Sequence, residues 1–292
     1  MLQHSAVVIN LLYVNIINNL KDTLMRVRYT GGIFSMAEEV VIEAKGLTKQ
    51  FTETVIAVED AIFQIPKGSF ISLVGPSGCG KSTLLRLIAG LIDKTDGDLS
   101  IRNMPVNGPR KDLGLMFQKA VLLEWRTAIE NVLLPNEIRG DVGPEAKRKA
   151  WDGLQLVGLT DFEFSFPRQL SGGMQQRVAL ARLLQTGADI MLLDEPFGAL
   201  DEFTRERLNV ELLNIVDDPE ITTLFVTHNI TEAIFLADKV FVMTPRPGRI
   251  AAMIDINLPK PRTIEMETTP EFNALIKEVR DVLSGHLDGA PL

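Results

Sequence analysis

Short, mostly apolar runs recur along the chain. They span residues 70–74, 113–117, 190–193, 222–226 and 239–243. Runs of this length and composition are typical of strands in a buried, parallel sheet. Two earlier segments, 38–44 and 55–65, also have strand character, and Pro66-Lys67-Gly68 closes the second. The pattern therefore predicts a buried sheet preceded by two further strands.

Apolar residues repeat at helical spacing between these runs. Helices are predicted at residues 81–91, 145–157, 172–185, 231–237 and 270–283. The alternation of strands and helices favours an α/β core with right-handed crossover connections. Because the sequence has no internal repeat, we expect one such unit and not two fused halves.

The two ends of the chain differ from this core. Residues 6–20 are apolar but contain several asparagines, and they lack the basic segment and the small-residue cleavage site of a signal peptide. We expect residues 1–37 to form a disordered extension, translated from a start upstream of Met36. An amphipathic segment on a membrane surface is the alternative. Residues 259–292 are expected to form a proline-rich linker and a terminal helix.

Composition and charge narrow the class of protein. Of the 292 residues, 46% are hydrophobic and 23% are charged, as in ordinary globular proteins with a buried core. The net charge of −8 argues against a nucleic-acid partner. The single cysteine, Cys79, excludes an internal disulfide and fits a reducing compartment. No apolar stretch reaches the roughly 18 residues of a transmembrane helix, so work at a membrane would require a membrane-spanning partner.

A glycine-rich segment after the run 70–74 has the pattern of a phosphate loop. It reads Gly75-Pro76-Ser77-Gly78-Cys79-Gly80-Lys81-Ser82-Thr83. Glycines let backbone N–H groups turn toward phosphates, and the helix beginning at Lys81 adds its positive end. We expect Lys81 to contact the β- and γ-phosphates, Ser82 to bind Mg²⁺ and Thr83 to bond the α-phosphate. Cys79 is interpreted as a small spacer.

Two acids follow the run 190–193. Asp194 is expected at the carboxyl end of a buried strand, the edge where open α/β sheets bind ligands. There it would hold Mg²⁺, chiefly through water, opposite Ser82. Glu195 would polarise the attacking water as a general base. Adjacent acids after a strand are by themselves more typical of a helix cap, and the upstream phosphate loop favours the catalytic interpretation.

A further motif connects the chain with a known family. Leu170-Ser171-Gly172-Gly173-Met174-Gln175-Gln176-Arg177 matches the signature motif of ABC ATPases. Gln118 resembles the Q-loop glutamine of that family, Ala199-Leu200-Asp201 its D-loop, and His228 its switch histidine. Phe51 lies where the family places an aromatic side chain that stacks on adenine. The resemblance covers about residues 38–258.

This resemblance implies a P-loop NTPase core with an antiparallel β subdomain and an inserted α-helical subdomain at about residues 119–170. It implies ATP and Mg²⁺ as cofactors. The metal would be held by Ser82, Gln118 and Asp194. The catalytic residues would be Glu195, His228 and Gln118. An ordinary structural histidine is the alternative for His228, and an ordinary edge-strand phenylalanine is the alternative for Phe51.

Two positions depart from the family pattern. Asn229 replaces the aspartate often found beside the switch histidine, and we expect little effect because this position is not a phosphate ligand. Phe51 replaces tyrosine, which keeps the stacking face and loses only a hydroxyl.

The signature segment is a candidate for a second anion site. Ser171 and the N–H groups of Gly172 and Gly173 would open a helix, whose start attracts anions. From the residues alone, Ser171 could equally be a plain helix cap. The resemblance implies that this site and Asp201 meet the ATP of a second copy of the chain, so that two subunits enclose two nucleotides.

Two stretches, residues 117–127 and 243–250, resemble the corresponding segments of ABC ATPases that serve importers of nitrate, sulfonates, taurine and related solutes. This implies transmembrane permease subunits as partners, a solute-binding protein as an indirect partner, and a peripheral location on the cytoplasmic face of the inner membrane. Leu122, Leu123, Trp125 and Val132 are candidates to line a groove for the permease, although some of them must belong to the internal core. The alternatives are a soluble ABC ATPase without a transport role and a regulatory nucleotide-binding module. Residues 82–171 contain no sustained heptads and the catalytic residues are present, which favours the importer.

Overall fold

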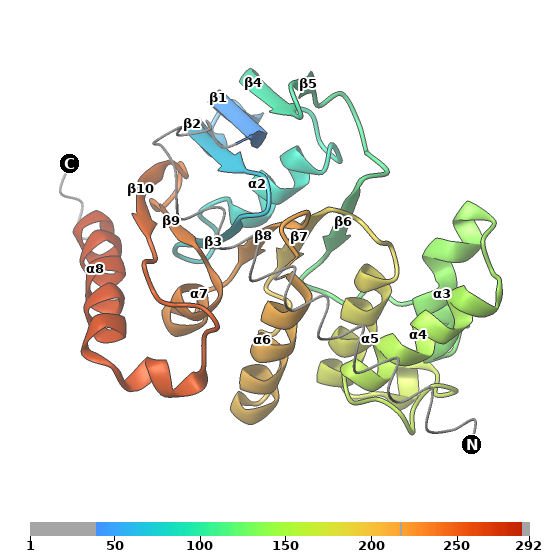
Figure 1. Cartoon of the computed structure of the whole chain (residues 1–292). Coiled ribbons are helices and arrows are strands. Elements are labelled where there is room, and N and C mark those ends of the chain that lie inside the picture. Colours follow the sequence, from blue (N-terminus) through green and yellow to red (C-terminus); the bar gives the residue numbers. More distant parts are fainter. Residues whose placement is uncertain (1–38, 217, 288–292) are drawn as a thin grey trace, which may run out of the picture. The chain divides into compact units, whose positions relative to one another are not determined.

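The computed structural model describes residues 39–216 and 218–287, so the expected N-terminal extension lies outside the described residues. Six strands form the central sheet, in the order β10-β9-β3-β8-β7-β6 (Figure 1). Their bounds are Phe70–Val74 (β3), Leu113–Met116 (β6), Ile190–Asp194 (β7), Thr222–Val226 (β8), Lys239–Met243 (β9) and Ile250–Asp255 (β10). β10 pairs antiparallel with β9, and the other neighbours are parallel. Every residue of β3, β7 and β8 is buried, which explains their largely apolar sequences.

Four strands form a second, antiparallel sheet in the order β2-β1-β4-β5. Their bounds are Val40–Thr52 (β1), Val55–Pro66 (β2), Asp96–Ile101 (β4) and Met104–Pro105 (β5). This sheet confirms the expected antiparallel β subdomain. β1 continues past its predicted end at residue 44, because its pairing with β2 extends to the turn between Thr52 and Val55. The sequence pattern misses β4, in which only Leu99 and Ile101 are buried.

Helices connect and cover these sheets. The α-helices of the described residues are α2 (Lys81–Ile88), α3 (Ala128–Arg139), α4 (Pro144–Leu156), α5 (Gly172–Leu184), α6 (Glu202–Val216), α7 (Ile230–Leu236) and α8 (Pro270–Leu287). Short 3₁₀ helices lie at Pro167–Gln169 and Ile264–Thr268. α2 ends at Ile88 and not at the predicted residue 91, because Gly90 turns the chain with a left-handed φ of 67°.

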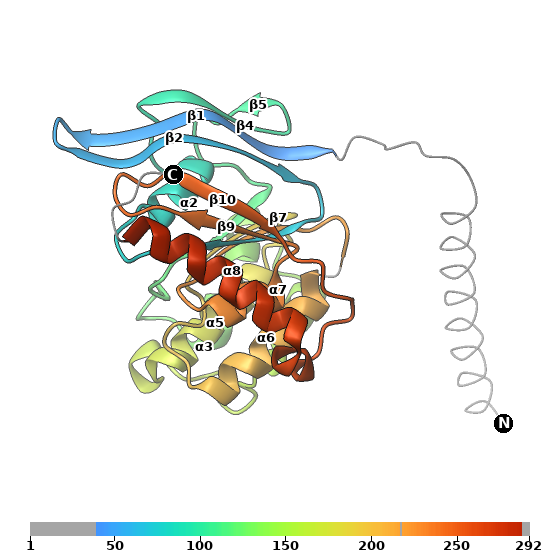
Figure 2. The same ribbon diagram turned by 90° about the vertical axis from the view of Figure 1, so that its left-hand side faces the viewer.

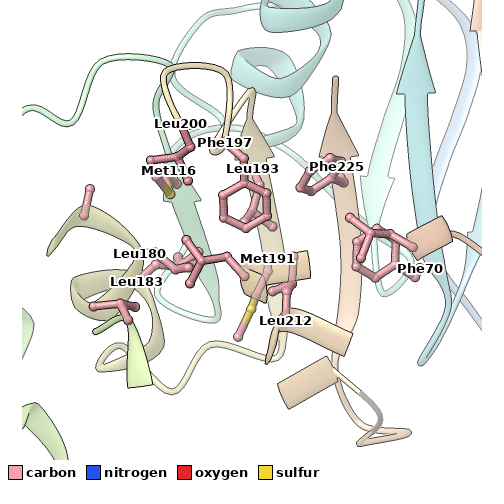
Figure 3. Packing of buried hydrophobic residues seen from close by; sticks show 14 of the residues in the cluster. Phe70, Met116, Leu180, Leu183, Met191, Leu193, Phe197, Leu200, Leu212 and Phe225 are labelled. Atoms are coloured by element: carbon pink, nitrogen blue, oxygen red, sulfur yellow. The ribbon is translucent and has the colours of Figure 1, made fainter. Parts of the chain in front are cut away.

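The central sheet lies between two hydrophobic layers. On one face, Met191 and Leu193 of β7 and Phe225 of β8 pack with residues of α5 and α6 (Figure 3). On the other face, Ile190 and Leu192 belong to the same hydrophobic cluster as residues of α2 and of the antiparallel sheet. This second sheet lies on the same side of the central sheet as α2 (Figure 2). Successive residues of β7 therefore alternate between the layers, as a pleated strand requires.

Three helices pack on one another beside the central sheet. α3 and α4 lie within the expected helical segment at about 119–170, and both pack against α5. The terminal helix α8 packs against α7, β9 and β10. Within residues 39–216 and 218–287, no helix is both long and apolar enough to cross a bilayer.

Candidate nucleotide-binding and hydrolysis site

The phosphate loop joins β3 to α2. At two positions of this loop the backbone has a conformation that only glycine adopts without strain. Gly78 and Gly80 have φ angles of 75° and 112°. A Cβ atom at Gly80 would lie 2.4 Å from the carbonyl oxygen of Ala57. Gly80 is also the N-cap of α2, and no acidic residue lies in the first turn of that helix. The positive end of α2 is therefore free to attract an anion.

The Lys81 side chain folds over this loop. Its Nζ atom donates hydrogen bonds of 2.8 and 2.9 Å to the carbonyl oxygens of Gly75 and Pro76, and the residue is buried. An ammonium group held at a glycine-rich loop before a helix fits the triphosphate of a nucleotide. Cys79 is buried below it, and burial raises the pKa of its thiol, in agreement with a spacer role.

A turn from a distant part of the chain supports the loop. Gly248 pairs with Ala57 and Val58 of β2, and a Cβ atom at Gly248 would lie 2.0 Å from the carbonyl oxygen of Cys79. Only glycine leaves room for this approach. The turn within the stretch 243–250 therefore contributes to the shape of the phosphate loop, a role that its sequence does not reveal.

Two of the three proposed metal ligands, Ser82 and Asp194, meet at the edge of the sheet, whereas Gln118 bonds Glu195. Ser82 Oγ donates a hydrogen bond of 2.9 Å to Oδ1 of Asp194, the last residue of β7. Burial raises the pKa of the Asp194 carboxyl, while the bond from Ser82 lowers it. A hydroxyl and a carboxylate oxygen side by side are the hard donors that Mg²⁺ takes together with nucleotide phosphates. These residues therefore fit a Mg²⁺ ion.

The three proposed catalytic side chains meet on one oxygen atom. Oε2 of Glu195 lies 3.1 Å from Nε2 of Gln118 and 3.4 Å from Nδ1 of His228. These residues follow the carboxyl ends of the neighbouring strands β6, β7 and β8. Glu195 has a left-handed φ of 47°, and its N–H donates to the carbonyl oxygen of Val226. Such a conformation is uncommon outside glycine and is concentrated at functional sites.

The signature helix α5 holds the segment that carries Gln118. Gln176 Nε2 donates to the carbonyl oxygen of Gln118. The Arg182 guanidinium donates to the carbonyl oxygens of Ala120 at 2.7 Å and of Val121 at 2.9 Å. Sequence reasoning assigns no role to Gln176 or Arg182; a signal was available in the polar side chains that α5 carries among apolar ones.

The start of α5 is exposed at Ser171 and Gly172. Ser171 Oγ accepts a hydrogen bond of 3.2 Å from the N–H of Met174, so within one chain it acts as a helix cap. A Cβ atom at Gly172 would meet nothing within 4 Å, whereas one at Gly173 would lie 2.8 Å from Leu200 Cδ2. No hydrogen bond found among the described residues links 171–173 to the phosphate loop of the same chain.

Asp201 and Phe51 have less defined surroundings. Asp201 is exposed and caps α6 through a 3.0 Å bond from the N–H of Thr204, which lowers the pKa of its carboxyl. Phe51 is 54% exposed near the end of β1, where Lys49 Nζ lies 5.1 Å from the ring centroid. An exposed ring could stack on a base, and the alternative of an ordinary strand residue stays open.

The expected permease groove needs one correction. Val132 is fully buried in the hydrophobic core, so it cannot line a surface groove. Trp125 is 73% exposed, and Leu122 and Leu123 are half-buried. The buried Asn131 side chain fixes this loop, because it bonds both the N–H and the carbonyl oxygen of Leu123.

The chain is similar to known proteins over most of its length. Residues 58–198 match a family model described as ABC transporter. The chain is 42% identical over 243 residues to the aliphatic sulfonates import ATP-binding protein SsuB of Bacillus cereus, a match that covers 82% of this chain and 94% of that protein. It is 42% identical over 240 residues to the taurine import ATP-binding protein TauB of Rhizobium johnstonii, covering 80% and 91%. A solved dimeric post-hydrolysis state of the ATP-binding cassette MJ0796, bound to ADP and Pi, superposes with a TM-score of 0.68 at 32% identity, covering 75% of this chain and all of that one.

Proposed function

Because this chain belongs to the ABC transporter family of ATP-binding proteins, we propose that it hydrolyses ATP to power the import of a small solute through a membrane permease. One observation carries the hydrolytic part of this proposal. Gln118 and His228 converge on Oε2 of Glu195, next to the pair formed by Ser82 and Asp194. A base, two side chains that lie against it and a pair of metal ligands thus occupy one edge of the sheet.

The residues divide the work of hydrolysis. When bound, Mg·ATP supplies the phosphoanhydride bond that is cleaved. Lys81 places its positive charge at the phosphate loop, and Ser82 and Asp194 would hold the metal ion. Glu195 accepts the proton of the attacking water at Oε2. Gln118 and His228 keep that oxygen in place, because both side chains lie against it.

We further propose that two copies of the chain act together. Ser171, Gly172 and Gly173 open α5 toward solvent, and this end of the helix is suited to the phosphates of an ATP held by the partner. Asp201 lies next to Leu200, which packs against Gly173, so it would reach the same interface. The solved cassette MJ0796 is a dimer, which supports this arrangement. The ATPase domain would span about residues 38–258, with 259–292 as a terminal linker and helix.

The importer part of the proposal rests on relatives that import sulfonates and taurine. The protein would be peripheral, on the cytoplasmic face of the membrane, and would act on the solute-binding protein only through the permease. The exposed Trp125 with Leu122 and Leu123 would contact the permease. The solute class would be a sulfonate, taurine, nitrate or a similar small molecule.

Steady-state ATPase activity of the full-length protein tests this function. Glu195→Gln should lower turnover at least about a hundredfold and should accumulate as a dimer in Mg·ATP, because binding persists without the base. Glu278→Gln, an exposed carboxylate of α8, is the matched control and should keep parental activity. Parental turnover in Glu195→Gln would refute Glu195 as the base.

A further inference from the structure

A buried carboxyl lies directly behind the His228 segment. Glu232, in the first turn of α7, is only 5% exposed. Its Oε2 atom accepts a hydrogen bond from the hydroxyl of Thr227, the residue before His228. The hydrolytic scheme above gives Glu232 no role. A buried carboxyl that is not fully paired costs stability, so its presence calls for another contribution.

The hydrogen bonds around Glu232 fix both neighbours of His228. The N–H of Asn229 donates to Thr227 Oγ1 at 3.0 Å. The N–H of Glu232 donates to Oδ1 of Asn229 at 3.2 Å. Thr227 is also anchored to the central sheet, since its N–H donates to the carbonyl oxygen of Leu73. His228 is therefore a single residue between two fixed ones, with a side chain that is 60% exposed and directed at Glu195.

The opposite side of Glu232 faces α6. Burial raises the pKa of the Glu232 carboxyl, and the hydrogen bond from Thr227 lowers it, followed by the charge of Arg205 and the amide of Asn209 in α6. Arg205 donates a 2.9 Å hydrogen bond to the carbonyl oxygen of Leu200, the residue before Asp201. Among the described residues, Glu232 Oε1 and Asn209 Oδ1 have no hydrogen-bond partner.

We propose that Glu232 is a positioning residue that fixes His228 against Glu195. The carboxyl acts through Thr227 and Asn229 and does not itself reach the nucleotide edge. This inference rests on the proposed catalytic role of His228.

The test compares Glu232→Ala with Glu232→Gln in the full-length protein. Glu232→Ala should lower kcat at least about tenfold and change the KM for ATP by no more than about twofold, because the phosphate loop is untouched. Glu232→Gln should keep at least about half of the parental kcat, since its amide oxygen can accept the Thr227 bond. Leu99→Ala in β4, a core truncation remote from α6 and α7, controls for lost stability and should leave kcat unchanged.

A double-mutant cycle separates positioning from a general structural role. In a His228→Ala background, adding Glu232→Ala should cause less than about a twofold further loss, because its effect passes through the missing imidazole. If Glu232→Ala does not fold, Thr227→Val, which has the same shape and lacks the donor, should lower kcat about threefold or more. Multiplicative losses in the double variant, or parental kcat in both Glu232→Ala and Thr227→Val, would overturn the proposal. Parental turnover in His228→Ala alone would instead refute the proposed role of His228.

Discussion

The hydroxyl of Ser82 donates a 2.9 Å hydrogen bond to the carboxylate of Asp194, although 112 residues separate the two in the sequence. The bond joins the first turn of α2 to the carboxyl end of β7. It brings a neutral and an anionic oxygen together at the end of the phosphate loop. The metal site is thus arranged by the packing of α2 on the sheet.

Removing the hydroxyl should weaken metal binding selectively. Ser82→Ala should raise the Mg²⁺ concentration for half-maximal ATPase activity at least about tenfold, because one of the oxygen ligands is lost. Ser82→Thr keeps the hydroxyl and should behave as the parent. A Mg²⁺ titration of the ATPase rate checks both variants, and an unchanged midpoint in Ser82→Ala would remove Ser82 from the metal site.

Gly80 should tolerate no side chain. Gly80→Ala combines a left-handed φ of 112° with a contact of 2.4 Å to a backbone oxygen, and we expect it to lower the free energy of unfolding by about 2–4 kcal/mol. Gly187→Ala is the matched control, because Gly187 has a φ of 62° but open space around it, and should lose only about 1 kcal/mol. Urea unfolding without nucleotide measures both. Equal losses would mean that the contact with Ala57 relaxes without cost.

Trp125 should matter for coupling and not for hydrolysis itself. It is 73% exposed and is not among the proposed catalytic residues, so Trp125→Ala should keep the ATPase rate of the isolated subunit. In membranes with the permease, solute-stimulated ATPase activity should fall at least about tenfold, because large exposed aromatics dominate interface energies. Trp151→Ala, at an aromatic position of α4 that is 41% exposed, should have little effect. Normal stimulation of Trp125→Ala would exclude this loop from the permease contact.

The ionisation of Asp112 should make part of the free energy of unfolding depend on pH. The Arg110 guanidinium, which donates two hydrogen bonds of 2.9 and 2.8 Å, holds the pKa of the Asp112 carboxyl below its usual range. Because the folded pKa is the lower one, the stabilisation is complete above the unfolded pKa of about 3.9 and is lost as pH falls through the folded pKa.

Asp112→Asn should therefore lower the free energy of unfolding by about 1 kcal/mol at pH 7, after allowance for partial exposure, and by much less below about pH 3. Urea unfolding at both pH values measures the difference. Asp161→Asn, an exposed acid, is the control and should show no such trend. A pH-independent loss in Asp112→Asn would indicate that packing, and not ionisation, is responsible.

How far the sequence could be interpreted depends on how local each feature is. The phosphate loop and the signature are contiguous motifs, so the sequence alone predicts both their residues and their chemistry. The buried strands β3, β7 and β8 are also predicted, because burial on both faces leaves a mostly apolar run. β4 and α6 are missed because most of their residues are exposed or half-buried and give no clear period.

Features that depend on partners distant in sequence required the tertiary structure. The sequence identifies Gln118, Glu195 and His228 as separate candidates. Only the order of β6, β7 and β8 places Gln118 and His228 against the same oxygen atom of Glu195. Hydrophobicity predicts contact with apolar surroundings without distinguishing a partner protein from the core. The sequence therefore left open which of the four groove candidates belong to the core, and the structure shows that Val132 does.

By itself, the sequence determined the family, the nucleotide chemistry and the central strands, because each depends on residues that are adjacent in the chain. The tertiary structure decided how Arg182 holds the Gln118 segment and how Gly248 shapes the phosphate loop. Each of these roles depends on a contact between residues that are far apart in the sequence. Local periodicity reports which face of an element is buried, and only folding determines what that face meets.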